Sequence, residues 1–229
     1  MSRFAPSLFA AAVLACAGSV QAVPLNDSFV AQPFVDTALH GTTSAARPEL
    51  AGTVLQDVIT SFSFGALNIF GTVQNRVVRE DGTGTLDFYW RILVDPASTG
   101  GGIGAFRLID FGYSNLTDAD WRIDGLGANG PEIARLFNPA THPEGAINFL
   151  FDPAVAAGTD GSSFFFLHTS ATNYALTANY DLLGGRSQTL SDEFQTFAPA
   201  AAVPEPSVMA MLGLGLAVLG VAKRRRTRG

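Results

Sequence analysis

The stretch Leu86-Asp87-Phe88-Tyr89-Trp90-Arg91-Ile92-Leu93-Val94 decides the fold class of this chain of 229 residues. Every second residue is apolar, which is the period-two pattern of a β-strand with one face toward a core. The predicted core face holds Leu86, Phe88, Trp90, Ile92 and Val94. Asp87 and Arg91 point to the opposite face, so the pattern predicts a β-strand over residues 86–94.

Similar patterns lie on both sides of this strand. Residues 68–79 form a preceding strand candidate, and Glu80-Asp81-Gly82-Thr83 has the composition of a hairpin turn between the two. Further strands are expected over residues 54–64, 105–111, 146–151, 162–169, 173–183 and 188–197. Consecutive Phe164-Phe165-Phe166 indicates a strand that is covered on both faces or an aromatic edge.

One segment has helical character. Glu132–Phe137 is bounded by Pro131 and Pro139, and it is long enough for one or two turns only. Because the remaining pattern is a series of short strands, the sequence predicts an all-β domain, either an antiparallel β-sandwich or a jelly roll.

The first 22 residues have the features of a secretory signal peptide. Arg3 precedes an apolar stretch over residues 8–17, and Val20-Gln21-Ala22 is a small-residue cleavage site. We therefore expect export by the general secretion machinery and cleavage by signal peptidase after Ala22. Val13-Leu14-Ala15-Cys16 leaves a lipoprotein alternative open, although Leu14 occupies a position where lipoproteins prefer a small residue.

The last 27 residues, 203–229, combine an extended element, an apolar run and a basic end. Residues 207–222 carry no charge, and as a helix they would span roughly 24 Å, less than a hydrocarbon core of about 30 Å. Snorkelling of Lys223 and slight thinning of the bilayer would make up the difference, so a transmembrane helix is expected. The positive-inside rule keeps the C-terminus in the cytoplasm. The basic stop consists of Lys223, Arg224, Arg225, Arg226 and Arg228.

Pro204-Glu205-Pro206 stands directly before this span. The two prolines keep the approach to the helix extended and exposed, in a form that a protease can bind. These physical features fit a permanent single-span anchor and a processed sorting signal equally well. The order of Pro204-Glu205-Pro206, a short Gly/Leu/Ala-rich span and an Arg-rich end resembles the PEP-CTERM sorting signal of exported Gram-negative bacterial proteins. The resemblance implies that exosortase, a membrane-embedded cysteine protease, recognises the Pro-Glu-Pro element and removes the span. The cargo would then pass from the inner membrane to the cell surface or the extracellular matrix.

The domain organisation follows from these segments. We expect a signal peptide at 1–22, a β-sandwich cargo domain at 23–197, a small-residue linker at 198–202 and the sorting signal at 203–229. Between residues 23 and 202 the chain has eight arginines, no lysine and nineteen acidic residues, a net charge of −11. Nucleic-acid binding is therefore not expected, and an anionic polysaccharide would need a bridging divalent cation. The same residues lack cysteine, which excludes thiolate sites and disulfides there.

Three aspartates give the best metal candidate. Asp118, Asp120 and Asp124 offer hard oxygen ligands suited to Ca²⁺, but Arg122 occupies a place where an EF-hand-like loop needs a ligand. Turn chemistry alone also explains these residues, and no other cofactor is expected. Residues 125–130 have the spacing of a dinucleotide fingerprint, yet the βαβ context is absent, so a loop is expected there. The three histidines lack the spacing of a helical zinc site.

No catalytic residue is predicted, because the chain has no Gly-x-Ser-x-Gly elbow, and a Ser-His-Asp triad assembled only in space stays open. We expect a non-enzymatic structural or adhesive protein of the cell surface or the extracellular polymer matrix. The alternative is a carbohydrate-binding module or a glycan-active enzyme on the same scaffold. Exposed aromatic residues would favour that alternative, with Trp121 the better surface candidate and Trp90 expected in the core.

Overall fold

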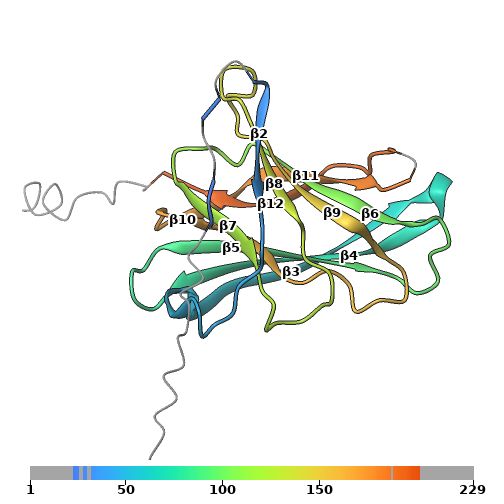
Figure 1. Cartoon of the computed structure of the whole chain (residues 1–229), viewed down its shortest axis with the longest axis horizontal. Coiled ribbons are helices and arrows are strands. Elements are labelled where there is room, and N and C mark those ends of the chain that lie inside the picture. The colour runs from blue at the N-terminus through green and yellow to red at the C-terminus, as the bar shows by residue number, and fades with distance from the viewer. Residues whose placement is uncertain (1–22, 26–27, 30–31, 187, 202–229) are drawn as a thin grey trace, which may run out of the picture.

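The computed structural model describes residues 23–25, 28–29, 32–186 and 188–201. They form two six-stranded antiparallel sheets that pack face to face, the β-sandwich expected from the alternating strands (Figure 1). The first sheet contains β1 (Val23–Pro24), β7 (Leu116–Trp121), β10 (Phe165–Thr169), β5 (Leu86–Val94), β4 (Ile69–Glu80) and β3 (Gly52–Phe64) in that spatial order. The second contains β12 (Phe194–Pro199), β11 (Tyr174–Gly184), β6 (Gly102–Ile109), β9 (Ile147–Ala156), β8 (Ile133–Phe137) and β2 (Phe34–Ala38).

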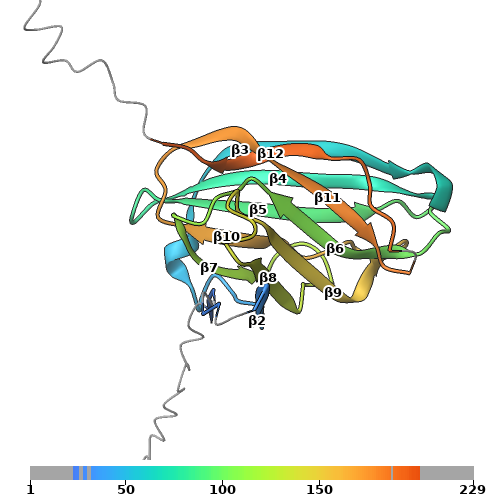
Figure 2. The same ribbon diagram turned by 90° about the horizontal axis from the view of Figure 1, so that it is seen from above.

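The edge strand β3 of the first sheet and the edge strand β12 of the second sheet lie on the same side of the sandwich (Figure 2). Figure 2 shows β3 and β12 along one side of the sandwich and β7, β8 and β2 toward the other. The only helices among the described residues are two 3-10 turns, η1 (Pro48–Leu50) and η2 (Gly65–Leu67). None of the described helices is long and apolar enough to cross a bilayer.

Strand β5 has the predicted bounds, and the residues predicted to face the core do so. Leu86, Phe88, Trp90, Ile92 and Val94 belong to the main core between the sheets. Tyr89 belongs to a second, smaller cluster on the outer face of the first sheet. Asp87 lies on that outer face too, and it is fully buried. This strand is therefore covered on both faces, because loops pack over the outer face of its sheet.

The phenylalanine triplet confirms the same arrangement. Phe165 packs in the main core, whereas Phe164 and Phe166 belong to the outer cluster with Tyr89. The prediction of a strand covered on both faces is thus confirmed. The outer cluster also contains Leu50 and Val78.

Trp90 connects the two sheets at the centre of the core, as its predicted core position implied. Its indole Nε1 donates to Thr196 Oγ1 at 2.9 Å, and this hydroxyl donates to Asn75 Oδ1 at 2.9 Å. Thr196 belongs to β12 of the second sheet, and the other two residues belong to the first. The chain of hydrogen bonds satisfies buried polar atoms that would otherwise cost stability.

The predicted hairpin is present, and each predicted strand overlaps an observed one. β4 and β5 pair antiparallel around the turn at residues 80–83, and β3, β6, β9, β10, β11 and β12 overlap the other predicted strands. The helical expectation for Glu132–Phe137 is wrong. Residues 133–137 form β8, which pairs with β2 and β9, so backbone bonding to neighbouring strands outweighs the weak local preference.

The predictions for the two ends of the chain fall on residues that the structure does not describe. The signal-peptide cleavage site at Ala22, the Pro204-Glu205-Pro206 element, the predicted span and the basic stop all lie outside the described residues. At the boundary, β12 ends at Pro199 and the Ala200 amide donates to the Asn173 carbonyl. The sandwich therefore continues into the first residues of the segment expected to be a linker.

Candidate functional site

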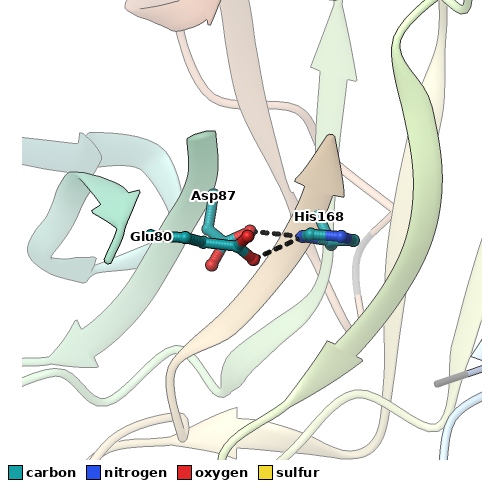
Figure 3. A group of neighbouring side chains, drawn as sticks. All are labelled: Glu80, Asp87 and His168. Carbon is teal, nitrogen blue, oxygen red and sulfur yellow. Dashed lines mark hydrogen bonds and ion pairs between the residues drawn. The ribbon is translucent and has the colours of Figure 1, made fainter. Parts of the chain in front are cut away.

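A row of ionisable side chains crosses the outer face of the first sheet. His168 of β10 is the register partner of Asp87 on β5 and of Asp118 on β7. Because directly opposed residues in an antiparallel pair project from the same face, the three side chains lie next to one another. Glu80, at the end of β4, joins them from the β4–β5 hairpin. We call Glu80, Asp87 and His168 the acid–histidine cluster (Figure 3).

Both carboxylates of the cluster point at one imidazole nitrogen, as Figure 3 shows. His168 Nδ1 lies 2.7 Å from Asp87 Oδ1 and 3.0 Å from Glu80 Oε1. Glu80 is 2% exposed and Asp87 is 0% exposed, while the His168 side chain is 16% exposed. The second oxygen of Glu80 accepts hydrogen bonds from the hydroxyls of Thr83 and Thr85 in the hairpin turn.

Asp118 forms an ion pair with an arginine and is not counted in this cluster. Arg47, which precedes η1, donates to both Asp118 oxygens at 2.7 and 3.2 Å. Its Nε donates to Glu49 at 2.8 Å, and its guanidinium lies 5.5 Å from the centre of the Phe166 ring. Arg47 and Asp118 are both buried, so this is a bidentate ion pair inside the protein.

Burial and mutual contact shift the pKa values of Asp87 and His168. Burial raises the pKa of Asp87 to about 6, although the hydrogen bond with His168 opposes that rise. For His168, burial alone would lower the pKa, but the hydrogen bond with Asp87 and the charges of Asp87, Asp118 and Glu80 raise it. A carboxylate-bound imidazole of this kind is used in proteins both as a proton acceptor and as a metal ligand.

A pocket of about 290 Å³ opens on the same face of the sheet. Tyr89, Phe164, Leu50, Val78 and Leu126 provide its apolar lining, and Arg76 and Arg122 provide its positive charge. The guanidinium of Arg76 lies 4.7 Å from the centre of the Phe164 ring and donates to Asp57 at 2.7 Å. Burial raises the pKa of the Tyr89 hydroxyl, so this group stays a neutral phenol.

The structure does not bring the three predicted calcium ligands into one group. Asp118 binds Arg47, and Asp120 Oδ1 accepts from the amides of Gly41 and Trp121. Asp124 accepts from the amide and hydroxyl of Ser44 and from Arg122. Each carboxylate is thus bound by its own protein donors, but most of these donors are 71–80 residues away in the sequence rather than on the nearby backbone that the turn interpretation invoked.

Neither tryptophan is fully exposed. Trp90 is buried, and Trp121 packs against the main core. A Cβ on Gly130 would lie 2.1 Å from Trp121 Cδ2, and one on Gly41 would lie 2.7 Å from Trp121 Cε2, so the backbone of both glycines covers the indole. Trp121 is the more exposed of the two tryptophans, as expected, but it is only partly exposed and the two glycines cover part of its indole. Residues 125–130 form a loop before β8, as expected.

The sequence alone does not reveal the acid–histidine cluster. The sequence pattern places Asp87 on the outward face of a strand and Glu80 in a turn. For His168 the sequence shows only that its spacing from the other histidines does not match a helical zinc site. The available signal is an aspartate within a strongly apolar strand, because a buried carboxylate needs a partner.

Comparison with known proteins locates one known element, at the C-terminal end. A family model described as the PEP-CTERM protein-sorting motif matches residues 202–226. No curated protein and no solved structure matches the chain. The motif indicates an exported protein that exosortase processes at the membrane, in agreement with the resemblance of its tail. The chain is therefore a β-sandwich protein that carries a PEP-CTERM sorting motif, which indicates exosortase-dependent sorting.

Proposed function

We propose that the mature protein is a non-enzymatic structural or adhesive component of the cell surface or the extracellular polymer matrix, which associates with further copies of itself. The sorting motif supports delivery out of the cell. The observation that carries the adhesive role is the edge of the first sheet at β3.

Strand β3 is thirteen residues long and has an open edge. Within the described residues, no strand pairs with this edge. Val54, Val58 and Ile59 are exposed along it, and Ile59 reaches 65%. Soluble proteins usually protect such an edge with lysine, proline or a short strand, and β3 contains no lysine and no proline. An open edge with apolar side chains is suited to pairing with another strand.

The charge of the edge favours a second copy as the partner. Asp57 is the only charged residue of β3, and Arg76 neutralises it at 2.7 Å within the same sheet. Two β3 edges can therefore approach without direct repulsion, even though the cargo domain as a whole is acidic. Antiparallel pairing of β3 with β3 would join the first sheets of two molecules into one continuous sheet.

A charge on the edge tests this proposal. Ile59→Lys places an ammonium group on the pairing edge, whereas Leu176→Lys places the same charge on the exposed side of β11, which is not an edge strand. Sedimentation velocity of the purified mature protein should show concentration-dependent association for the wild type and for Leu176→Lys. Ile59→Lys should stay monomeric and should be lost from the cell-surface fraction. Equal association of all three proteins, or a wild type that is monomeric at every concentration, contradicts the proposal.

A second candidate is a carbohydrate-binding module or a glycan-active enzyme. The pocket on the outer face of the first sheet favours it, since it combines an apolar lining with Arg76 and Arg122. Arg76 already covers Phe164, however, which leaves less aromatic surface for a sugar ring. A glycan array with and without Ca²⁺ separates the two candidates: binding that Arg122→Gln abolishes would favour the carbohydrate function.

A further inference from the structure

We propose that the acid–histidine cluster of Glu80, Asp87 and His168 is a binding site for one divalent transition-metal ion, with Zn²⁺ the best match to its ligands. One ligand atom from each residue lies within 4.8 Å of the other two. Imidazole nitrogen and carboxylate oxygen are both ordinary ligands of zinc. The inference concerns the folded cargo domain and does not depend on how the protein is sorted.

The first argument is that the cluster has more buried acceptor atoms than donors. Glu80 Oε1 and Asp87 Oδ2 are buried without a hydrogen-bond partner. The single Nδ1–H of His168 lies 2.7 Å from Asp87 Oδ1 and can be directed at only one oxygen, so the 3.0 Å approach of Glu80 Oε1 leaves that atom without a donor. Unsatisfied carboxylate oxygens in the interior are costly, and a cation beside His168 Nδ1 would satisfy Glu80 Oε1 directly and Asp87 Oδ2 if that carboxylate bound in bidentate form.

The second argument is the balance of buried charge. Arg47 neutralises Asp118, so it leaves none of its charge for Glu80 and Asp87. Two carboxylates and one imidazolium still leave a net negative charge inside the protein. A divalent ion with a neutral imidazole brings the same three side chains to zero. The metal ion would take the position of the Nδ1 proton, which is released to solvent on binding.

The third argument concerns which metal the ligands prefer. Ca²⁺ takes six to eight oxygen ligands, whereas the cluster offers one nitrogen and two carboxylates. Imidazole together with carboxylate suits Zn²⁺ and its neighbours in the transition series. Ligands about 2.0–2.2 Å from a tetrahedral zinc lie about 3.3–3.6 Å apart, so His168 would withdraw from Asp87 by roughly half an ångström or more. Because His168 is the only partly exposed member, the ion would enter, and a water would complete its coordination, on the imidazole side.

A metal ion bound at the cluster would also affect the stability of the first sheet. Glu80 and Asp87 belong to the β4–β5 hairpin, and His168 belongs to β10, which pairs with β5 and β7. A bound ion would therefore cross-link three strands of the first sheet. Such a link replaces the covalent cross-links that the cysteine-free cargo domain does not have.

Calorimetric titration of the mature protein tests the site, after removal of metals with a chelator and dialysis. At pH 7.5 we expect one Zn²⁺ per chain and a raised melting temperature. Asp87→Asn and Glu80→Gln keep the shape of each side chain but remove its charge, and each should weaken Zn²⁺ binding at least about tenfold. His142→Gln removes a histidine outside the cluster and should leave the affinity unchanged. Lowering the pH to 5.5 should weaken binding, because protons compete for the ligands.

The titrations can also overturn the proposal. Circular dichroism first establishes that each variant is folded, and having two charge-removing variants keeps the test valid if one of them fails to fold. A folded wild type that binds no stoichiometric Zn²⁺, or binding that is equal in the wild type and the folded cluster variants, contradicts the site. Binding lost in His142→Gln but kept in Asp87→Asn, or Ca²⁺ bound more tightly than Zn²⁺, would contradict it as well.

Discussion

His168 and Asp87 are register partners on adjacent strands, and the imidazole Nδ1 of one lies 2.7 Å from the carboxylate Oδ1 of the other. Both sit on the outer face of a sheet whose other face forms the main core. Asp87 is fully buried and the His168 side chain is 16% exposed, so the folded protein holds a shared proton in a hydrogen bond that the unfolded chain lacks.

The stability of the metal-free protein should therefore depend on pH in a defined direction. The Asp87 carboxyl has its ordinary pKa of 3.8 in the unfolded chain and a pKa of about 6 in the folded protein, so the folded state holds more protons between these values. Its contribution, on the order of 2–3 kcal/mol, is present at low pH and is lost as the pH rises through 6. The raised pKa of His168 acts in the same direction, with stability that is present at low pH and lost as the pH rises through its folded value, and it belongs to the same coupled pair, so the two contributions are not summed.

Urea unfolding at pH 4.5, 6 and 8 in the presence of a chelator measures this dependence. Asp87→Asn should flatten the curve, because it removes one titrating group and the partner of the other. Asp57→Asn should leave the curve parallel to the wild type above pH 5, since contact with Arg76 and Gln74 lowers the pKa of Asp57 despite its partial burial. Parallel curves for the wild type and Asp87→Asn would contradict the shared-proton account.

Arg47→Gln should destabilise the protein strongly. It leaves the buried carboxylate of Asp118 without its ion-pair partner and beside the acid–histidine cluster, at a cost on the order of 3–5 kcal/mol. Arg135→Gln removes a comparable bidentate pair with Asp36 at the surface and should cost about 1 kcal/mol or less. Denaturant unfolding compares the two, and adding Asp118→Asn to Arg47→Gln should restore part of the loss. Equal losses of unfolding free energy for Arg47→Gln and Arg135→Gln would show that burial does not determine the strength of the Arg47–Asp118 ion pair.

Thr196→Val should weaken the connection between the sheets. The change leaves Trp90 Nε1 and Asn75 Oδ1 buried without their shared hydroxyl partner, which predicts a loss of about 1–3 kcal/mol. Thr172→Val alters an exposed threonine and serves as the control. Thermal unfolding reports both, and a Thr196→Val protein as stable as Thr172→Val would mean that the hydrogen-bond chain contributes nothing.

Gly130→Ala tests the covering of Trp121. The added Cβ would lie 2.1 Å from the indole, so either the loop or the ring must shift, with an expected cost of about 1–3 kcal/mol. Gly82→Ala meets no atom within 4 Å and is the matched control. Tryptophan fluorescence should change for Gly130→Ala only. An unchanged spectrum and unchanged stability would show that the indole is not held between the glycines.

The strands were predictable wherever one face carries large apolar residues at every second position, as in β5. Strand β8 was not, because its two inward residues are Ala134 and Leu136, and flanking prolines made the segment resemble a short helix. The acid–histidine cluster was beyond prediction for a different reason. Glu80 and Asp87 come from one hairpin, but His168 reaches them only because β10 inserts between β5 and β7. Strand order of this kind depends on long-range packing, which a local pattern does not specify.

The sorting account concerns the tail and is tested there. Mass spectrometry of the C-terminal peptide, on protein recovered separately from the medium and the envelope, is the most direct measurement. We expect the released wild type to lack Lys223–Gly229 and the apolar span, because exosortase removes them, and we expect replacement of Glu205 to retain the uncut form in the envelope. Released protein that still contains Arg228 would contradict the account and would leave the tail as a plain membrane anchor.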